Sequence, residues 1–586
     1  MLCWLSVILP IDPQVLDDVI VATKSKIENE FNDQPYCEGR LSTSALSTAV
    51  SCIALQTIDA EKYGEKIYRA LNWLLEHINE DGGWGDSVKS PSNLSTSLLC
   101  WAALKNHEGS KLCMMEEYLS SKLGLITPEN IISSLAKIYG EDKTFAVPIC
   151  MALSIRGRFG EAPKCWKWLD ALPFELAAAP QSWYPYFKMN VVSYAIPALI
   201  SIGILKHKKD PAVLPLKWIR SSLVDRCLNK LRAVQPNNGG FLEAVPLTGF
   251  TAMALFTAGY KDHDVLKKAE SFLSASILED GSSPIDTNLC CWVTSLSLQT
   301  LSNTKTKLDL EQVKTWLSRC QWKTRDPYAG AAPGGWAWTP LPGGVPDADD
   351  TSAALLALMM SNYREILVLK HGVNWLLKLQ NNDGGMPTFC RGWGQLPFDQ
   401  SCTDITAHAL RVFDLYGKLF PHEVTIHIQS AVDKAVEFLR REQRTDGSWL
   451  PLWFGSQDHP HKKNPVYGTS KVLLALKKEQ PSMRDRGLDY LLSVQQEDGG
   501  FGGHKHGKAS IEETGLALKA MCQFDRTERA CELAVDWLIQ HTKGGTEFIE
   551  TPIGLYFASL WYSEKMYPII FSCDGLLTYK EKINKN

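Results

Sequence analysis

Apolar residues recur along this chain at helical spacing, in segments that end at short polar turns rich in glycine. The turns share one pattern, which reads Gln, two residues, Asp, Gly and then Gly or Ser, often followed by an aromatic residue. Clear copies stand at 380–385, 443–449 and 495–501, and weaker ones at 78–84, 235–241, 280–282 and 540–545. Glycine adopts the positive φ values that end a helix, so the pattern predicts helix after helix, each closed by a similar turn.

The spacing of these turns predicts the fold. In the C-terminal half about 50–60 residues separate the clear copies, which is room for two helices of ordinary length. One outer and one inner helix per unit, repeated about six times, closes into an α/α barrel. Copies occur in both halves, and strand signals are sparse; the apolar segment 146–153 contains Pro148 and is read as part of a buried helix. We therefore predict an all-α protein of two α/α barrels, with long loops at 328–346 and 455–465.

Composition narrows the protein class. The 586 residues are 45% hydrophobic and 22% charged, which is typical of a globular protein. The net charge is −4 and no block of basic residues occurs, so nucleic acid is not expected as a partner. The 19 Trp indicate either recurring packing motifs or a cavity with aromatic walls.

The cysteine content and the lengths of the apolar segments indicate where in the cell the protein is located. The 16 Cys are scattered without a Cys-x-x-Cys pair, which favours a reduced, cytoplasmic protein. Residues 2–10 are apolar but lack basic residues and are too short for a signal anchor. No run of about 20 apolar residues predicts a membrane span. The nearest approach, 191–205, is interrupted by Pro197 and is expected to be buried or interfacial.

The strongest chemical signal is an acidic cluster formed by Asp347, Asp349 and Asp350, just before a long apolar run. Such residues at a helix N-terminus can simply gain about 0.3–1 kcal/mol from the helix dipole. In a closed site, however, crowded carboxyls raise one another's pKa, so that one of them, which we take to be Asp349, stays protonated near neutral pH. A protonated acid beside apolar sequence is what the protonation of a hydrocarbon requires.

The acidic cluster, the Thr351 that follows it and the glutamine–glycine turns together resemble the squalene–hopene cyclase family of class II triterpene cyclases. The resemblance covers most of the chain and is strongest over 281–571. It implies an inserted barrel at 40–280 and a catalytic barrel at 281–586, completed by an N-terminal helix within 10–39, with the active cavity between them. It also implies protonation of a terminal alkene or epoxide of a linear isoprenoid such as squalene, followed by cyclisation through carbocations, without metal or cofactor.

The resemblance extends to a second group of residues. Asp404 and His408 lie four residues apart, so they share one helix face. They match the family's Asp-x-Thr-x-His helix, whose histidine would orient Asp349 and compensate its charge after proton transfer. A lone histidine on such a helix is more often part of the core, and the acidic cluster is what favours the functional reading. Tyr467 resembles the family tyrosine that reaches the same network.

The family also lines its cavity with aromatic rings, which stabilise a buried cation by roughly 2 kcal/mol each without acting as bases. By resemblance, Trp338 faces the growing cation, and core packing is the alternative for each ring. The other positions so assigned are Trp336, Phe389, Trp453, Tyr194, Tyr556 and, as an acidic wall residue of more structural character, Asp286. Tyr556 stands where phenylalanine is expected, and the loop carries additional residues at 459–463, so product and substrate length stay open.

Two other readings remain. A cyclase of a prenyl diphosphate or a prenylated aromatic would need a basic pocket or Mg²⁺ ligands, and no Asp-Asp-x-x-Asp motif occurs. A zinc prenyltransferase-like or purely binding α/α barrel would lack the acidic cluster, and no zinc-ligand spacing is found. Because an isoprenoid is nearly insoluble, we expect monotopic attachment to a membrane surface, with the aromatic stretch from Trp183 to Val191 as the candidate contact. A homodimer is possible.

Overall fold

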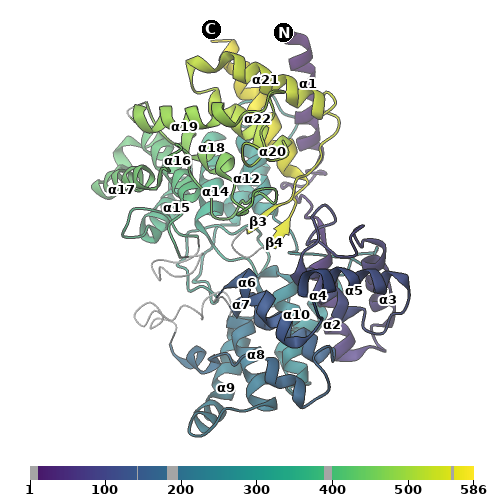
Figure 1. Cartoon of the computed structure of the whole chain (residues 1–586). Helices are drawn as coiled ribbons and strands as arrows, with labels where there is room; N and C mark the ends of the chain where they lie inside the picture. Colours follow the sequence, from purple (N-terminus) through teal and green to yellow (C-terminus); the bar gives the residue numbers. More distant parts are fainter. Residues whose placement is uncertain are drawn as a thin grey trace.

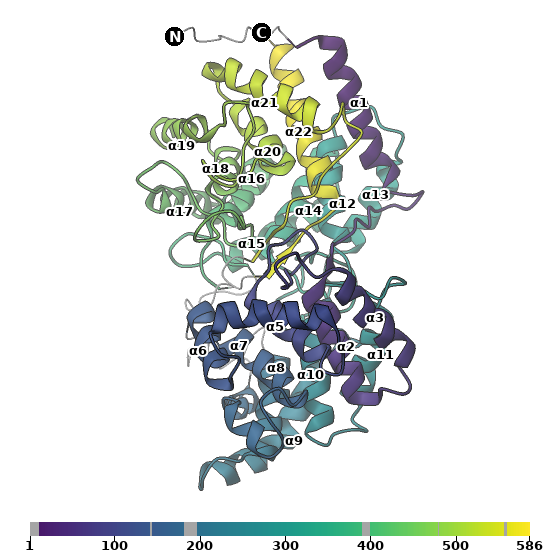
Figure 2. The same cartoon turned by 45° about the vertical axis from the view of Figure 1, so that its right-hand side comes forward.

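The computed structural model describes residues 11–140, 143–180, 196–388, 399–478, 480–555 and 560–585. The chain forms two helical lobes, one above the other in Figure 1. Residues from β1 to β2 make the lower lobe, and the rest make the upper lobe, where α1 runs beside α22 (Figures 1 and 2). Strands are limited, in the described parts, to two short antiparallel pairs. The prediction of an all-α protein is confirmed.

The first pair shows how the chain enters and leaves the lower lobe. Strand β1 (Thr43–Ser44) begins the lobe, and β2 (Ser283–Pro284) ends it, with Thr43 opposite Pro284. Entry and exit therefore lie side by side, as they must when one domain is inserted into another. The second pair, β3 (Ile553–Leu555) and β4 (Leu560–Tyr562), lies between the lobes (Figure 1).

Six inner helices of the upper lobe pack in a closed ring: α12 against α14, then α16, α18, α20 and α22, which returns to α12. These helices are α12 (Cys290–Leu301), α14 (Ala348–Met360), α16 (Thr403–Leu419), α18 (Pro465–Leu473), α20 (Ile511–Met521) and α22 (Met566–Ile583). The outer helices are α1 (Pro13–Asn29), α13 (Leu310–Arg319), α15 (Ile366–Leu379), α17 (Ile426–Glu442), α19 (Pro481–Val494) and α21 (Glu528–His541). Helix α14 is buried on nearly all sides, whereas α17 buries one stripe, as inner and outer positions require.

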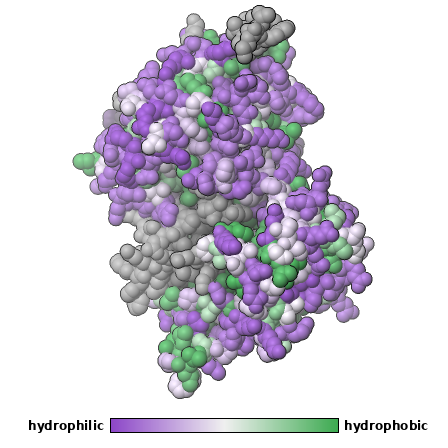
Figure 3. Space-filling model, viewed as in Figure 1, coloured by the Kyte–Doolittle hydropathy of each residue, from purple (hydrophilic) through white to green (hydrophobic). Residues whose placement is uncertain are grey.

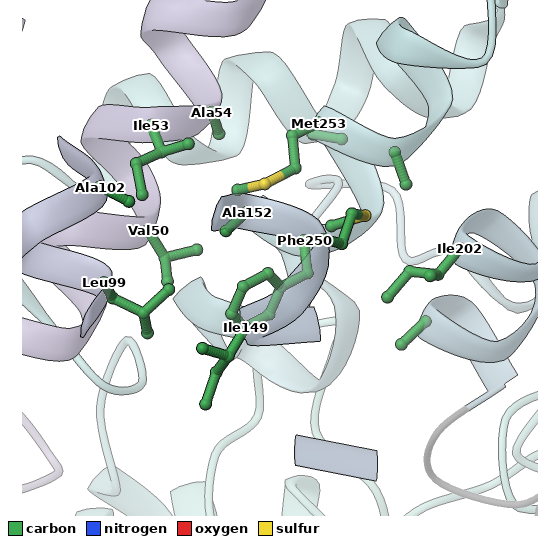
Figure 4. Packing of buried hydrophobic residues seen from close by; sticks show 14 of the residues in the cluster. Val50, Ile53, Ala54, Leu99, Ala102, Ile149, Ala152, Ile202, Phe250 and Met253 are labelled. Carbon is green, nitrogen blue, oxygen red and sulfur yellow. The ribbon is translucent and has the colours of Figure 1, made fainter. Parts of the chain in front are cut away.

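The lower lobe closes a ring of five inner helices among its described residues, one fewer than the repeat predicts: α2 (Ala45–Asp59), α4 (Leu94–Ala103), α7 (Lys143–Ile155), α8 (Ile196–Lys209) and α10 (Val245–Thr257). Around it lie α3 (Gly64–Glu76), α5 (Ser110–Leu123), α6 (Pro128–Tyr139), α9 (Leu216–Val234) and α11 (Asp264–Ser276). Figure 4 shows apolar side chains of the inner helices converging at its centre. As predicted, Pro148 lies inside a helix, α7.

Short 3₁₀ helices complete the described elements: η1 (Lys164–Trp168), η2 (Phe174–Ala178), η4 (Phe241–Glu243), η5 (Pro421–Glu423) and η6 (Asp525–Thr527). Of the helices in the described part, none combines the length and the apolar character needed to cross a bilayer.

The glutamine of the repeated turn ties neighbouring units together. The Gln380 amide donates to the carbonyl of Gly384 in its own turn at 2.8 Å and to that of Ala431 on α17 at 2.9 Å. Gln235, Gln443 and Gln495 make the same two kinds of bond. Each turn is thus fixed to the next outer helix by a single side chain.

A further copy of the turn escaped the sequence pattern because a loop separates its glutamine from its glycines. Gln321 donates to the carbonyls of Gly334 and Val368 at 2.9 and 3.0 Å. The aromatic residue of this copy is Trp336, whose indole donates to the Leu317 carbonyl at 2.8 Å and is fully buried. Trp449 makes the equivalent bond to Leu439 in another copy.

Replacing the turn glutamine tests this tie. Gln380→Ala leaves two buried carbonyls without their donor, so we expect the free energy of unfolding to fall by about 2 kcal/mol. The matched control is Gln429→Ala, because the exposed Gln429 amide donates to Asp433 on its own helix, α17. Urea denaturation followed by circular dichroism measures both. Equal stability of the two variants would show that the turn glutamine does not hold the units together.

Candidate active site

A cavity of ≈ 360 Å³ lies between the two lobes and takes its walls from both. Most of the lining is apolar or aromatic. The lower lobe contributes residues that include Leu46, Leu99, Ile149, Leu247 and Phe250, and the upper lobe contributes Trp292, Trp338, Trp453, Phe454, Tyr562 and Tyr567. Five carboxyl groups also line it, those of Asp86, Asp286, Asp347, Asp349 and Asp350.

The predicted acidic cluster occupies the N-terminal end of α14. Asp347 is the N-cap residue, and its Oδ1 accepts the backbone N–H of Asp350 at 2.8 Å. The Asp347 N–H donates in turn to the carbonyl of Trp336 at 3.0 Å, in an antiparallel bridge. Asp347 therefore does cap its helix, as the simpler reading holds, but all three residues of the cluster also line the cavity.

Burial and crowding raise the pKa values of Asp347 and Asp350, so these two carboxyl groups share a proton. Burial raises the pKa of Asp347 to about 7, although its hydrogen bonds with Asp350 lower it. Burial, and then the charge of Asp347, raise the pKa of Asp350 well above its usual value. Two neighbouring buried carboxyls cannot both ionise cheaply, so this pair shares a proton near neutral pH.

Asp349 behaves differently because a histidine reaches it. His408 Nδ1 lies 2.5 Å from Asp349 Oδ1, and the His408 side chain is only 1% exposed. Burial raises the pKa of Asp349, but the charge and hydrogen bond of His408, with help from Lys471, outweigh it and leave that pKa below its usual value. The expectation that crowding keeps Asp349 itself protonated is therefore wrong: the proton stays on its two neighbours.

The pKa of His408 is lowered as well. Burial, then the charge of Lys471, lower the pKa of His408 to about 4, against the opposing effect of Asp349. At neutral pH the pair thus consists of a neutral imidazole that donates from Nδ1 and an ionised Asp349. Because its carboxylate is stabilised in this way, the protonated form of Asp349 is a stronger acid than an isolated buried carboxyl group.

Asp404 and Tyr467 stand near this pair, as the sequence predicted. Burial and the charge of Asp349 raise the pKa of Asp404 to about 6, and the Cys402 thiol donates a hydrogen bond to it. Burial and the charges of Asp349 and Asp404 raise the pKa of Tyr467 well above its usual value. The Tyr467 ring stacks on Phe454 with centroids 4.5 Å apart, which connects it to the cavity wall.

The predicted wall residues divide into two groups. Trp338, Trp453 and Asp286 line the cavity. The Trp453 indole donates to Thr388 at 2.9 Å. Burial raises the pKa of Asp286 well above the usual value, although the nearby Trp338 side chain lowers it. Trp336 does not line the cavity: it is the aromatic residue of a repeat turn, and its placement in the wall was wrong.

Three assigned positions, Phe389, Tyr194 and Tyr556, lie outside the residues that the structure describes. The same holds for the proposed membrane stretch from Trp183 to Val191.

Sequence reasoning missed several residues of the site. Trp292 presents a T-shaped contact to His408, with ring centroids 6.2 Å apart, and its indole donates to the Tyr567 hydroxyl at 3.0 Å. Phe454 directly follows the predicted Trp453, which was the available signal. Asp86, two residues after a repeat aromatic, accepts the Trp561 N–H at 2.9 Å and so links the lobes.

The buried Lys471 was missed because a single lysine in a helical sequence usually marks a solvated face. It is 7% exposed and lies on α18, one turn after Tyr467. Metal ligands are a separate question: within the described parts of the chain, no group of three or more His, Cys, Asp or Glu side chains is arranged to hold a metal ion.

Comparison with known proteins agrees with this geometry. Residues 289–515 match the model of the squalene-hopene cyclase C-terminal domain. The chain is 26% identical to a terpene cyclase–glycosyl transferase fusion protein of Humicola fuscoatra, over 84% of this chain and 44% of that protein, so it spans less than half of that relative. It is 24% identical to a squalene hopane cyclase of Aspergillus fumigatus, over 73% of this chain and 70% of the relative.

Among solved structures, ent-copalyl diphosphate synthase from Streptomyces platensis has the same fold, with a TM-score of 0.57 over 97% of this chain and 99% of that one, at 16% identity. The domain match, the relatives and the two-barrel fold lead to one conclusion. The chain carries a squalene-hopene cyclase C-terminal domain over residues 289–515 and is similar to squalene hopane cyclases and related terpene cyclases.

Proposed function

We propose that this chain is an isoprenoid cyclase in which Asp349 protonates the terminal alkene or epoxide of a linear substrate such as squalene. The observation that carries the proposal is the contact between Asp349 and His408 at the wall of an apolar cavity with aromatic sides. A carboxyl whose conjugate base is stabilised by a buried partner is a strong acid. An enclosed apolar space is where such an acid meets a hydrocarbon instead of water.

The first step transfers the proton of the Asp349 carboxyl to the substrate. The π electrons of the alkene form the new C–H bond and leave a cation on the neighbouring carbon; with an epoxide, the oxygen takes the proton and a C–O bond breaks. Asp349 is left as a carboxylate, and His408 Nδ1 donates a hydrogen bond to it. This stabilisation appears only as the charge develops, which is how it accelerates the step.

The cavity governs the later steps. Its walls hold the chain folded so that each alkene meets the next cation, which replaces a random encounter by a fixed approach. The rings of Trp338, Trp292 and Trp453 line the cavity, and aromatic rings stabilise a cation without acting as bases. Loss of a proton or capture of water ends the reaction.

The lining favours a neutral substrate over a diphosphate. Among the described residues that line the cavity there is no lysine, arginine or histidine. A diphosphate carried into this space would find no cationic partner there, whereas a polyene needs none. A diphosphate-bearing substrate is therefore the alternative that the assay below has to exclude.

The test is product formation from a panel of substrates. Purified protein is incubated with squalene, oxidosqualene, geranylgeranyl diphosphate and a geranylgeranylated aromatic, and the extracts are analysed by gas chromatography–mass spectrometry. Asp349→Asn removes the transferable proton, so we expect turnover to fall by about 10³-fold or more. The control is Asp309→Asn, since asparagine can still cap α13 at this exposed position. Cyclisation that persists in Asp349→Asn contradicts the proposal.

The pH profile provides an independent check. A lowered pKa means that Asp349 is protonated only at low pH, so kcat/KM should rise as the pH falls. Above that pKa we expect an increase of about tenfold for each unit of decrease in pH. Initial rates in one buffer series between pH 8 and pH 5 measure it. A profile that rises towards alkaline pH is incompatible with Asp349 as the proton donor.

We also propose that the lower lobe contacts a membrane surface, from which it draws its substrate. A run of exposed apolar residues precedes and begins α9: Val213, Leu214, Leu216, Trp218 and Ile219. Val213 is 85% exposed and Trp218 70%, and Figure 3 shows apolar surface at this end of the lobe. The exposed Lys208, Lys209 and Lys217 flank these side chains, as at a lipid interface.

Liposome sedimentation measures this contact. We expect the double variant Val213→Ser/Trp218→Ser to lose most of the binding to vesicles that contain anionic lipid. The control is Ile426→Ser, which removes an isoleucine that is 81% exposed on the upper lobe. If both variants bind as the unmodified chain does, the contact lies elsewhere.

A further inference from the structure

We propose that Lys471 is a positioning residue of the acid site: its buried ammonium group, together with His408, compensates the negative charge left on Asp349 after proton transfer. The inference deepens the proposed function and rests on it for its kinetic consequences. The electrostatic part concerns the folded protein alone and can be measured without substrate.

The helix geometry fixes where this lysine lies. Asn464 caps α18, its Oδ1 accepting the Tyr467 N–H at 3.0 Å, which sets the rotation of the helix. Lys471 follows Tyr467 by one turn, and its Nζ lies 5.7 Å from the centroid of that ring. Because Tyr467 stacks on Phe454, which lines the cavity, the ammonium group sits behind the wall and does not line the cavity itself.

The charges around Lys471 come from three neighbouring helices. Burial lowers the pKa of Lys471. Asp349 on α14 and Asp404 on α16 oppose this shift as anions, and Arg411 on α16 and Lys519 on α20 add to it as cations. The cations have another partner, Asp574 on α22: Lys519 forms an ion pair with it, and its charge also acts on Arg411. Asp349 and Asp404 are thus the carboxyls that remain for Lys471.

A second buried lysine finds its partners away from the acid site. Lys314 on α13 is 5% exposed, and it pairs with Glu311 at 2.6 Å and donates to the Ser361 carbonyl at 3.1 Å. That lysine is satisfied by its own surroundings and has no connection to the cavity. A buried ammonium group is costly unless it faces a compensating charge, and for Lys471 that charge lies in the acid site.

This placement has one consistent effect on the site. The positive charge of Lys471 lowers the pKa of Asp349, of Asp404 and of His408. It therefore favours the conjugate base of Asp349, which makes the protonated form a stronger donor. It also keeps the imidazole neutral before the reaction. Removing the charge should raise all three pKa values together.

The titration of His408 tests the inference directly. Protein with ¹⁵N- and ¹³C-labelled histidine is titrated by NMR, and the His408 signal is assigned by its loss in His408→Asn. In Lys471→Met we expect the pKa of His408 to rise by about one unit. Lys471→Arg, which keeps the charge, and Lys314→Met, which removes a buried charge elsewhere, should leave it unchanged. An unmoved His408 titration in folded Lys471→Met overturns the inference. Should this variant fail to fold, Lys471→Gln replaces it in the same comparison.

The kinetic readout separates an electrostatic from a merely structural role. The pH series is extended below the pKa of Asp349 until kcat/KM levels off. In Lys471→Met the alkaline limb should then lie about one unit higher in pH, and the rate on the acidic plateau should fall, because the acid is weaker. A structural role would lower the rate without moving the limb. If the unmodified chain cyclises no substrate of the panel, the proposed function fails, and the NMR titration still decides the role of Lys471.

Discussion

The hydrogen bond between Asp349 and His408 is the interaction on which the site depends. It joins two inner helices, α14 and α16, through residues that lie 59 positions apart in the chain. Without it, burial would raise the pKa of Asp349, as it does that of Asp350, and the charge of Lys471 would be left to oppose the shift. With it, the conjugate base is stabilised inside an apolar enclosure, and the carboxyl can give its proton to a poor base. The closed ring of helices brings these two groups to one wall.

The repeated turn supports this arrangement from outside the site. Each glutamine fixes its turn to the next outer helix, and the turn that ends in Trp336 leads directly into the cavity wall at Trp338. The bridge between Trp336 and Asp347 then sets the start of α14. A motif that reads as a fold signature thus also positions the acid. This dual use explains why two tryptophans so close in sequence have different surroundings, one in the core and one at the cavity.

The sequence predicted what depends on local patterns. The period of the turns led to an all-α protein of α/α barrels, and the spacing of Asp404 and His408 placed them on one helix face. What it missed depends on contacts between distant segments. The inserted loop hid the turn of Gln321. The pKa of Asp349 depends on His408 and also on Lys471, which comes from a helix more than a hundred residues away. The adjacent carboxyl groups in the sequence suggested that Asp349 is protonated, but His408 and Lys471, which approach it in the folded structure, lower its pKa.

The distribution of charge along the cavity follows from the same physics. Of the five carboxyls that line it, Asp86, Asp286, Asp347 and Asp350 all have raised pKa values, chiefly because of burial, and this favours their neutral forms. Asp349 alone among them has a lowered pKa. In the proposed reaction, a cation that migrates away from Asp349 leaves behind the carboxylate that protonated it and passes carboxyl groups whose neutral forms are poor bases. A raised pKa would make Asp349 a weaker proton donor. At the other carboxyl groups of the wall the same effect of burial favours the neutral form, which does not quench the cation.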